Sequence, residues 1–153
     1  MPRVAIALGS NLGDRGATLD SALASLRALL SDLVASSYFE TAPVGMAPGA
    51  PSFLNAAAAG GFDGTPEALL AALHRIEAAH GRERPRPGAS RTLDLDLVLF
   101  GDERIESPDL VVPHPRFRDR RFVLAPLAEI AADWRDPVTG LTVADLLARL
   151  GGA

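Results

Sequence analysis

The sequence of 153 residues contains no cysteine and no lysine. Without cysteine the chain can form neither disulfides nor thiolate metal sites, so any metal must be held by oxygen or imidazole. No apolar run approaches the ~20 residues that span a bilayer. The first residues, MPRVAIALGSN, lack the charged start and long apolar stretch of a signal peptide. These absences predict a cytoplasmic protein that does not act at a membrane.

All fifteen basic residues are arginine, and the formal net charge is −4. This net charge argues against a general nucleic-acid binder. The positive charge is nevertheless concentrated, because eight of the arginines lie in the two short segments 82–91 and 116–121. Guanidinium groups can bind phosphate oxygens bidentately. The clusters therefore favour phosphate recognition, with simple solvated loops as the alternative.

The length suits one domain, residues 1–153, that can bury a core of its own. Alternating apolar residues predict strands, and leucines at helical spacing predict helices. We expect strands at 4–8, 33–41 and from 53, a loop at 9–15, helices at 17–30, 66–81, 122–133 and 142–151, and a hairpin in which 103–107 pairs back on 91–101. Such a mixture predicts an α+β fold with a mainly antiparallel sheet.

The stretch RTLDLDLVLFG, residues 91–101, reads as a strand with leucines 93, 95, 97 and 99 on one face. Asp94 and Asp96 then share the other face with Cα atoms ~6.5 to 7 Å apart. Converging carboxylates can hold hard cations, and Mg²⁺ combines a few carboxylates with phosphate and water. The alternative is that one aspartate caps a turn and the other points to solvent. Burying two unpaired carboxylates is costly, however, and a metal relieves that cost.

Further groups suited to phosphate surround this strand in the sequence. Arg91 precedes Asp94 by three residues, and His114 lies between prolines at the start of the second arginine cluster. A lone histidine is more often structural than catalytic, but its place at the start of an arginine cluster favours a phosphate contact equally. Neither GxxxxGK[ST] nor GxGxxG is present. Any nucleotide would therefore be held by arginines, metal and backbone.

Six motifs occur in an order that resembles the 6-hydroxymethyl-7,8-dihydropterin pyrophosphokinase family of folate biosynthesis. They are GSNLGDR, FETAPVG, FLNAA, RIEAAHGRER, RTLDLDLVLFG and VPHPRFRDRRFVLAPLAEIA. The likeness covers nearly the whole chain, and RTLDLD followed by VPHPR is its most specific part. It implies a ferredoxin-like α+β fold and transfer of pyrophosphate from ATP to the hydroxymethyl group of the pterin, with AMP as the second product.

The resemblance also implies roles for particular residues. Two Mg²⁺ ions would be bound by Asp94 and Asp96. The catalytic residues would be Arg82, Arg91, Asp94, Asp96 and His114. ATP would be bound by Glu77, Arg82, Arg84, Arg91, His114 and Arg120. The pterin would lie in a slot formed by Thr41, Pro43, Val44, Phe53, Asn55 and Phe122.

The implied partners are ATP and a reduced pterin, with no nucleic acid and no membrane, and the protein is expected to be a monomer. The segments 42–52 and 81–90, rich in proline and glycine, are candidates to close over the substrates. Two alternatives stay open. One is a homologue that binds pterin or nucleotide without catalysis, which the intact Asp94, Asp96 and His114 oppose. The other is a metal-dependent phosphohydrolase, which would need no pterin slot.

Overall fold

The computed structural model describes residues 1–11, 14–41, 52–81 and 93–151. Its main feature is a five-stranded antiparallel sheet in the order β2-β4-β1-β5, with β3 also paired to β4. The strands are β1 (Arg3–Ser10), β2 (Ser31–Ala35), β3 (Phe39–Thr41), β4 (Phe53–Gly61), β5 (Asp94–Phe100), β6 (Ile105–Glu106) and β7 (Val111–Val112). The helices are α1 (Arg15–Leu29), α2 (Pro66–Gly81), the 3-10 turn η1 (Phe117–Asp119), α3 (Arg121–Ala131) and α4 (Val143–Gly151).

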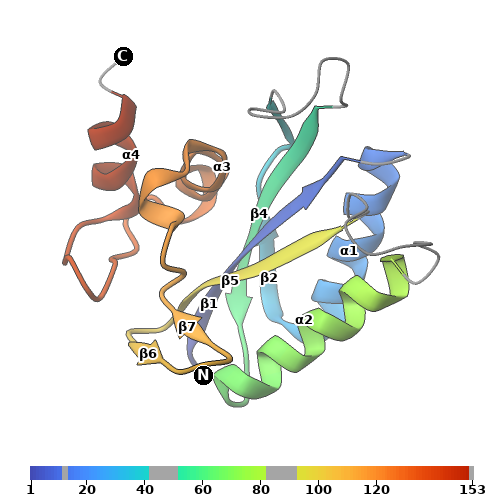
Figure 1. Ribbon diagram of the computed structural model, residues 1–153, viewed down its shortest axis with the longest axis horizontal. Coiled ribbons are helices and arrows are strands. Elements are labelled where there is room, and N and C mark those ends of the chain that lie inside the picture. The colour runs from blue at the N-terminus through green and yellow to red at the C-terminus, as the bar shows by residue number, and fades with distance from the viewer. Residues whose placement is uncertain (12–13, 42–51, 82–92, 152–153) are drawn as a thin grey trace.

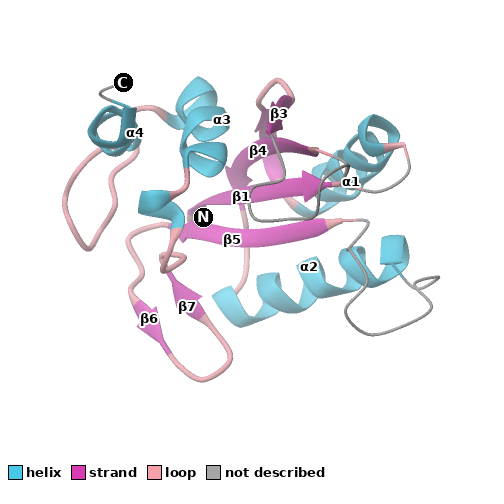
Figure 2. Ribbon diagram, turned by 45° about the horizontal axis from the view of Figure 1, so that its top comes forward, coloured by secondary structure: helices cyan, strands magenta, loops and turns pink. Residues whose placement is uncertain are grey.

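Two β-α-β units build the sheet, because α1 leads from β1 to β2 and α2 leads from β4 to β5. Both helices lie on one face, and α3 and α4 lie on the other (Figure 1). β5 forms the edge of the sheet beside α2 (Figure 2). This order and connectivity confirm the predicted ferredoxin-like α+β fold.

Side-chain caps explain where three of the helices begin. The carboxylate of Asp14 accepts a hydrogen bond from the amide of Ala17 at 3.0 Å, so α1 starts earlier than its leucines suggested. Thr65 caps α2 through a 3.1 Å hydrogen bond from the amide of Ala68 to its hydroxyl. Thr142 and Asp145 each accept from the other's backbone amide at 3.1 Å, which is a capping box at the start of α4.

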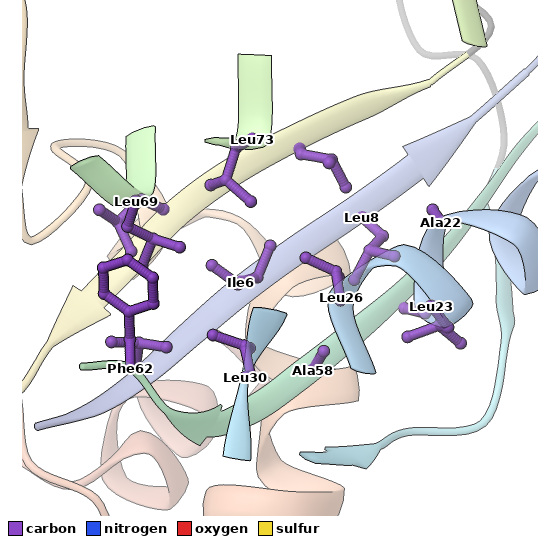
Figure 3. Close-up of a cluster of buried hydrophobic side chains, with 14 of the residues drawn as sticks. Ile6, Leu8, Ala22, Leu23, Leu26, Leu30, Ala58, Phe62, Leu69 and Leu73 are labelled. Atoms are coloured by element: carbon purple, nitrogen blue, oxygen red, sulfur yellow. The ribbon is translucent and has the colours of Figure 1, made fainter. Parts of the chain in front are cut away.

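The face under α1 and α2 is filled by large aliphatic side chains. Leu26 of α1 and Leu73 of α2 pack towards Ile6 in the middle of β1, and Phe62 closes one end (Figure 3). Ile6, Leu26 and Leu73 are fully buried. Burial of such a side chain contributes about 1.5 to 3 kcal/mol. This layer is therefore the main source of stability in the fold.

The opposite face is built from smaller residues. Ala5, Ala7 and Ala57 lie at its centre, and leucines of α3 and α4 pack over them. The alanines of β4, which are also compatible with a helix, lie in an extended strand between β1 and the two short strands β2 and β3. Small side chains here allow α3 to approach β4 closely.

The sequence predicted that leucines 93, 95, 97 and 99 all lie on one face of β5. This prediction is wrong for Leu99. Leu97 pairs with Ile6 and Leu99 pairs with Ala5, so Val98 is an extra residue without a partner on β1. This β-bulge shifts the side-chain direction by one residue. Leu97 therefore faces the α1 and α2 layer, whereas Leu99 packs with the α3 and α4 layer.

Three other predictions needed correction. β1 continues through Ser10, so Gly9 lies in a strand rather than in the predicted loop. The segment 33–41, predicted as one strand, belongs to two strands, β2 and β3. Between them, the Ser36 hydroxyl accepts a hydrogen bond from the amide of Ala57 at 2.9 Å, in place of a backbone carbonyl. Residues 105–106 pair with β7 rather than with β5. In the described part of the chain, no helix has the length and apolarity needed to cross a bilayer.

Candidate active site

Three neighbouring strands bring the predicted polar residues into one row. Gly9 of β1 lies opposite Asn55 of β4 on one side and opposite Asp94 of β5 on the other. In the next row on the same face, Ala7 lies opposite Asp96. The order β4-β1-β5 therefore separates the predicted pterin contact from the predicted metal ligands by one strand of small residues.

Two cavities meet at the aspartate pair. The first, of about 630 Å³, is bounded by α2, β5 and the chain from β7 to His114. The second, of about 730 Å³, is bounded by β1, β3, β4 and the start of α3. Both are lined by Asp94, Asp96 and Arg120. A ligand in either cavity would reach the same two carboxylates.

The carboxylates of Asp94 and Asp96 are partly exposed at this junction. Oxygen donors of this kind suit Mg²⁺, which usually completes its shell with phosphate oxygens and water. Over residues 1–11, 14–41, 52–81 and 93–151, no group of three or more acidic, histidine or cysteine side chains could hold a metal. The pair thus fits a cation that shares its coordination with a substrate.

Glu77 supports the strand between the two aspartates. Its Oε2 atom accepts a hydrogen bond from the amide of Leu95 at 2.8 Å. Because β5 is an edge strand, this amide has no partner strand of its own. Glu77 also lines the first cavity, together with His74 of the same helix.

His114 is fixed by its own backbone and by its neighbour. Its amide donates to the carbonyl of Val98 at 3.0 Å, so the bulge in β5 sets its position. Its Nδ1 atom accepts from the amide of Arg116 at 3.2 Å, which leaves the ring proton on Nε2. Burial lowers the pKa of His114; the charge of Asp96 opposes this shift, and the charges of Arg120 and Arg116 add to it. The histidine is therefore a neutral donor at the wall of the first cavity.

The second arginine cluster divides into different roles. Arg118 donates to both carboxylate oxygens of the buried Asp136, at 2.5 and 3.0 Å, and lies over the Phe117 ring. It is held away from a ligand role. Arg120, at the N-terminus of α3, lines both cavities, and Arg121 lines the second. The expectation that the whole cluster recognises phosphate is therefore wrong for Arg118.

The described members of the predicted pterin slot meet in the second cavity. Asn55 is buried, and its Nδ2 atom donates to the hydroxyl of Thr41 at 2.7 Å. Phe53 and Phe122 lie on opposite elements, β4 and α3, and Phe122 is 40% exposed. The Arg120 guanidinium lies 5.5 Å from the centre of the Phe122 ring. The cavity thus offers polar groups at its floor and aromatic surface at its walls.

An ionic cluster near this cavity was not predicted from the sequence. Arg15 of α1 donates to the carbonyl and hydroxyl oxygens of Ser52, at 2.8 and 3.1 Å, and pairs with Glu40 at 3.1 Å. The Ser52 hydroxyl also donates to Glu40 at 2.7 Å. The cluster joins the end of β3 to the start of β4, beside Thr41 and Phe53. Its members are too far apart in sequence to form a recognisable motif.

Five predicted site residues lie outside the described residues, namely Pro43, Val44, Arg82, Arg84 and Arg91. Most of the two segments predicted to close over the substrates also lies outside them. The other predicted site residues, Thr41, Phe53, Asn55, Glu77, Asp94, Asp96, His114, Arg120 and Phe122, all line one or both cavities.

Fold and site together define an α+β protein with a pair of carboxylates at the junction of two cavities. Residues 5–132 match the model of the family 7,8-dihydro-6-hydroxymethylpterin-pyrophosphokinase (HPPK). This match covers most of the chain, and the protein belongs to the HPPK family.

Curated relatives agree with the family match. The 2-amino-4-hydroxy-6-hydroxymethyldihydropteridine pyrophosphokinase of Bacillus subtilis is 47% identical, over 82% of this chain and 75% of the relative. The protein of the same name from Methylorubrum extorquens is 40% identical, over 98% of this chain and 94% of the relative.

Solved structures support the fold. The HPPK-DHPS triple mutant of Plasmodium falciparum, crystallised with SDX-DHP, matches with a TM-score of 0.76 at 14% identity. The match covers 97% of this chain but 44% of that larger chain. An HPPK-DHPS complex with substrates matches with a TM-score of 0.74 at 13% identity, over 97% of this chain and 43% of the other. At these identities the likeness concerns the fold alone.

Proposed function

We propose that the protein transfers the terminal pyrophosphate of ATP to the hydroxymethyl oxygen of 6-hydroxymethyl-7,8-dihydropterin. Membership of the HPPK family supports this reaction. The structural observation that carries it is the position of Asp94 and Asp96 between two cavities, each large enough for a substrate. A simple hydrolase needs one such cavity, whereas transfer between two bound molecules needs two that meet at the reacting group.

The reaction forms one bond and breaks one. The hydroxymethyl oxygen attacks the β-phosphorus of ATP, loses its proton to solvent, and the bond from that phosphorus to the α–β bridging oxygen breaks. AMP leaves with the bridging oxygen. In such transfers the protein contributes mainly by positioning and by stabilising charge. The two cavities would hold donor and acceptor in line across the aspartate pair.

Asp94 and Asp96 are proposed to hold Mg²⁺, two ions on the family resemblance. The ions would neutralise phosphate charge and clamp the attacking and leaving oxygens. In the first cavity, the Nε2–H of His114 would donate to a phosphate oxygen. Arg120 lines both cavities and would therefore face the transferred group. Arg82, Arg84 and Arg91 are proposed to bind the remaining phosphate oxygens, and Glu77 to help form the nucleotide side.

The second cavity is proposed to bind the pterin. Asn55 and Thr41 would recognise the amide edge of the ring, with Phe53 and Phe122 against its flat surface. Pro43 and Val44 are proposed to complete the slot. A heterocycle without matching donors and acceptors would leave the buried Asn55 amide unpaired, and this gives strong discrimination.

The test is to mix the protein with MgATP and 6-hydroxymethyl-7,8-dihydropterin and to separate the nucleotide products. We expect AMP and pterin diphosphate in equal amounts, formed only when both substrates are present. ADP or free phosphate without the pterin would instead indicate a hydrolase. Binding of both substrates without AMP would indicate the catalytically impaired homologue. Sedimentation at the assay concentration tests the further proposal that the chain acts as a monomer.

An Asn55→Ala variant connects this activity to the second cavity. We expect the pterin-dependent formation of AMP to fall sharply while affinity for MgATP stays unchanged. Asp102→Asn, in the exposed turn after β5, is the matched control. An Asn55→Ala variant with full activity would contradict the proposed pterin slot.

A further inference from the structure

Gly9 occupies a position where its backbone does not require glycine. Of the described glycines, Gly101 and Gly140 have positive φ angles, and Gly9 does not. It lies in β1 with a paired strand on each side. Glycine within a strand weakens it, because it has no side chain to pack and loses more conformational entropy. The missing side chain must therefore have another reason.

That reason lies in the side chain of Asn55. A Cβ atom on Gly9 would lie 3.1 Å from the Oδ1 atom of Asn55, which is closer than an ordinary contact. Asn55 has little freedom to move, since it is 5% exposed and its Nδ2 atom is bonded to Thr41 at 2.7 Å. A side chain at position 9 would therefore push the Asn55 amide away by a few tenths of an ångström and strain this bond.

Gly9 is also part of the cavity floor. It lines the second cavity between Asn55 and Asp94, and Ala7 lines the same cavity in the next row. Neighbouring strands are 4.7 to 4.9 Å apart, so Asn55 and Asp94 are separated by roughly 9.5 Å between Cα atoms. The backbone of Gly9 spans the middle of this interval. A ligand that reaches both residues must pass over the backbone of Gly9.

We propose that Gly9 is a specificity-determining residue: its bare backbone is the floor for a flat bicyclic heterocycle held between Asn55 and Asp94. The distance from Asn55 across Gly9 to Asp94 then selects ligands by the length of their ring system. Its hydrogen-bonding edge must meet Asn55 while its hydroxyl group, at the far end of the ring system, reaches the metal-binding carboxylates. This inference rests on the proposed pterin transfer and adds a steric requirement to it.

The experiment compares wild type, Gly9→Ala and Gly16→Ala in the AMP-forming assay. Gly16 lies in α1, where an added Cβ comes within ordinary distance, 3.8 Å, of Asp14, so it controls for the added methyl group. For Gly9→Ala we expect the KM for the pterin to rise about tenfold, equivalent to about 1.4 kcal/mol. The KM for MgATP should stay within about twofold, since one methyl group in the second cavity leaves nucleotide contacts intact. Gly16→Ala should match wild type in both.

A double-mutant cycle shows whether the methyl group acts through Asn55. In an Asn55→Ala background the close approach is gone, so Gly9→Ala should add much less than its tenfold effect on the pterin KM. Direct titration with the pterin gives the same comparison where turnover is low. If Gly9→Ala alone does not fold but the double variant does, the close contact with Asn55 is confirmed. If the double variant does not fold either, the asparagine is not the reason for glycine here.

The outcomes separate this inference from the function on which it rests. A wild-type protein that forms no AMP would remove the proposed function itself. A functional wild type with an unchanged pterin KM in Gly9→Ala would overturn only the role of Gly9. An equal rise in both KM values would also overturn it, because that result indicates general damage to the fold.

Discussion

The two faces of the central sheet differ in the size of their side chains. Under α1 and α2, leucines, Ile6 and Phe62 fill the space completely. On the opposite face, Gly9, Ala7 and Ala57 leave room, and α3 and α4 cover only part of it. The uncovered part carries the aspartate pair and the second cavity, whereas the first cavity lies at the edge of the sheet between β5 and α2. The main packed layer and the second cavity thus lie on opposite faces of the same strands.

The contrast shows how one strand can serve both purposes. In β5, Leu95 and Leu97 face the packed layer while Asp94 and Asp96 face the cavities. Period-two alternation keeps these sets apart. Mutations on the open face should therefore change kinetics with little loss of stability, and mutations on the packed face should do the reverse. Variants from each region can test that separation.

The largest expected effect is on the open face, in Asp96→Ala. Loss of one of the two carboxylates proposed to hold Mg²⁺ should lower kcat at least about 10³-fold, equivalent to about 4 kcal/mol of barrier. The melting temperature should hardly change, because Asp96 is partly exposed. Initial-rate assays at saturating MgATP and calorimetry measure the two quantities. Near-normal turnover would contradict the metal role of the pair.

On the packed face, Leu73→Ala should have the opposite effect. Leu73 is fully buried between α2 and the sheet, so its truncation leaves a cavity. We expect the free energy of unfolding to fall by about 3 to 4 kcal/mol, as measured by urea denaturation. Both KM values and kcat per folded molecule should stay the same. Leu73→Met, which conserves volume, is the control and should cost less than about 1.5 kcal/mol.

Asp136→Asn tests how much the ion pair between Asp136 and Arg118 contributes to stability. Asp136 is fully buried and binds Arg118, Thr139 and the amide of Val138. Removal of its charge leaves the Arg118 guanidinium without its partner and should destabilise the protein by about 3 kcal/mol. Asp145→Asn, which alters only the exposed cap of α4, is the control. An equal loss of unfolding free energy in the two variants would mean that the Asp136–Arg118 pair adds no stability.

The same pair predicts a dependence on pH. Burial alone would raise the pKa of Asp136, but hydrogen bonds from Arg118, Thr139 and Val138 outweigh it and hold the pKa below the ordinary value of 3.8. The stabilisation is therefore present above pH 3.8 and is lost as the pH falls through the lower pKa of the folded state. Denaturation curves should show that the difference in unfolding free energy between wild type and Asp136→Asn becomes smaller below pH 3.8. A constant difference would show that the charge of Asp136 is not involved.

The smallest effect is expected at the start of α2. Thr65→Ala removes the cap on the Ala68 amide and should cost about 1 kcal/mol of stability. Thr65 lies about three turns from Glu77, so kinetic constants should not change. Thr65→Ser retains the hydroxyl and should behave as wild type in thermal melts. A change in kcat for Thr65→Ala would show that the packed side does influence the site.

Local patterns predicted much of this architecture. Alternation along residues 4–8 predicted the first strand, and the helix predicted at 66–81 coincides with α2. The strand position of Asp94 and Asp96 was also predicted, because their leucine neighbours alternate with them. These features depend on residues close together in the chain, and local preferences decide them.

Features set by distant partners could not be predicted. The bulge at Val98 depends on pairing with β1, and the register of β1 is not visible in the residues of β5. Arg118 and Arg120 are the same residue type two positions apart. A buried aspartate eighteen residues further along, Asp136, decides that Arg118 is structural while Arg120 lines the cavities. The role of Gly9 likewise depends on Asn55 in another strand.

The edge of β5 has a consequence for behaviour at high concentration. Edge strands with unpaired backbone groups are templates for pairing with other chains. Here the Leu95 amide is covered by Glu77 and the Val98 carbonyl by the backbone of His114. The groups that form the wall of the first cavity therefore also block this edge from intermolecular association, so variants that open this wall risk aggregating as well as losing activity.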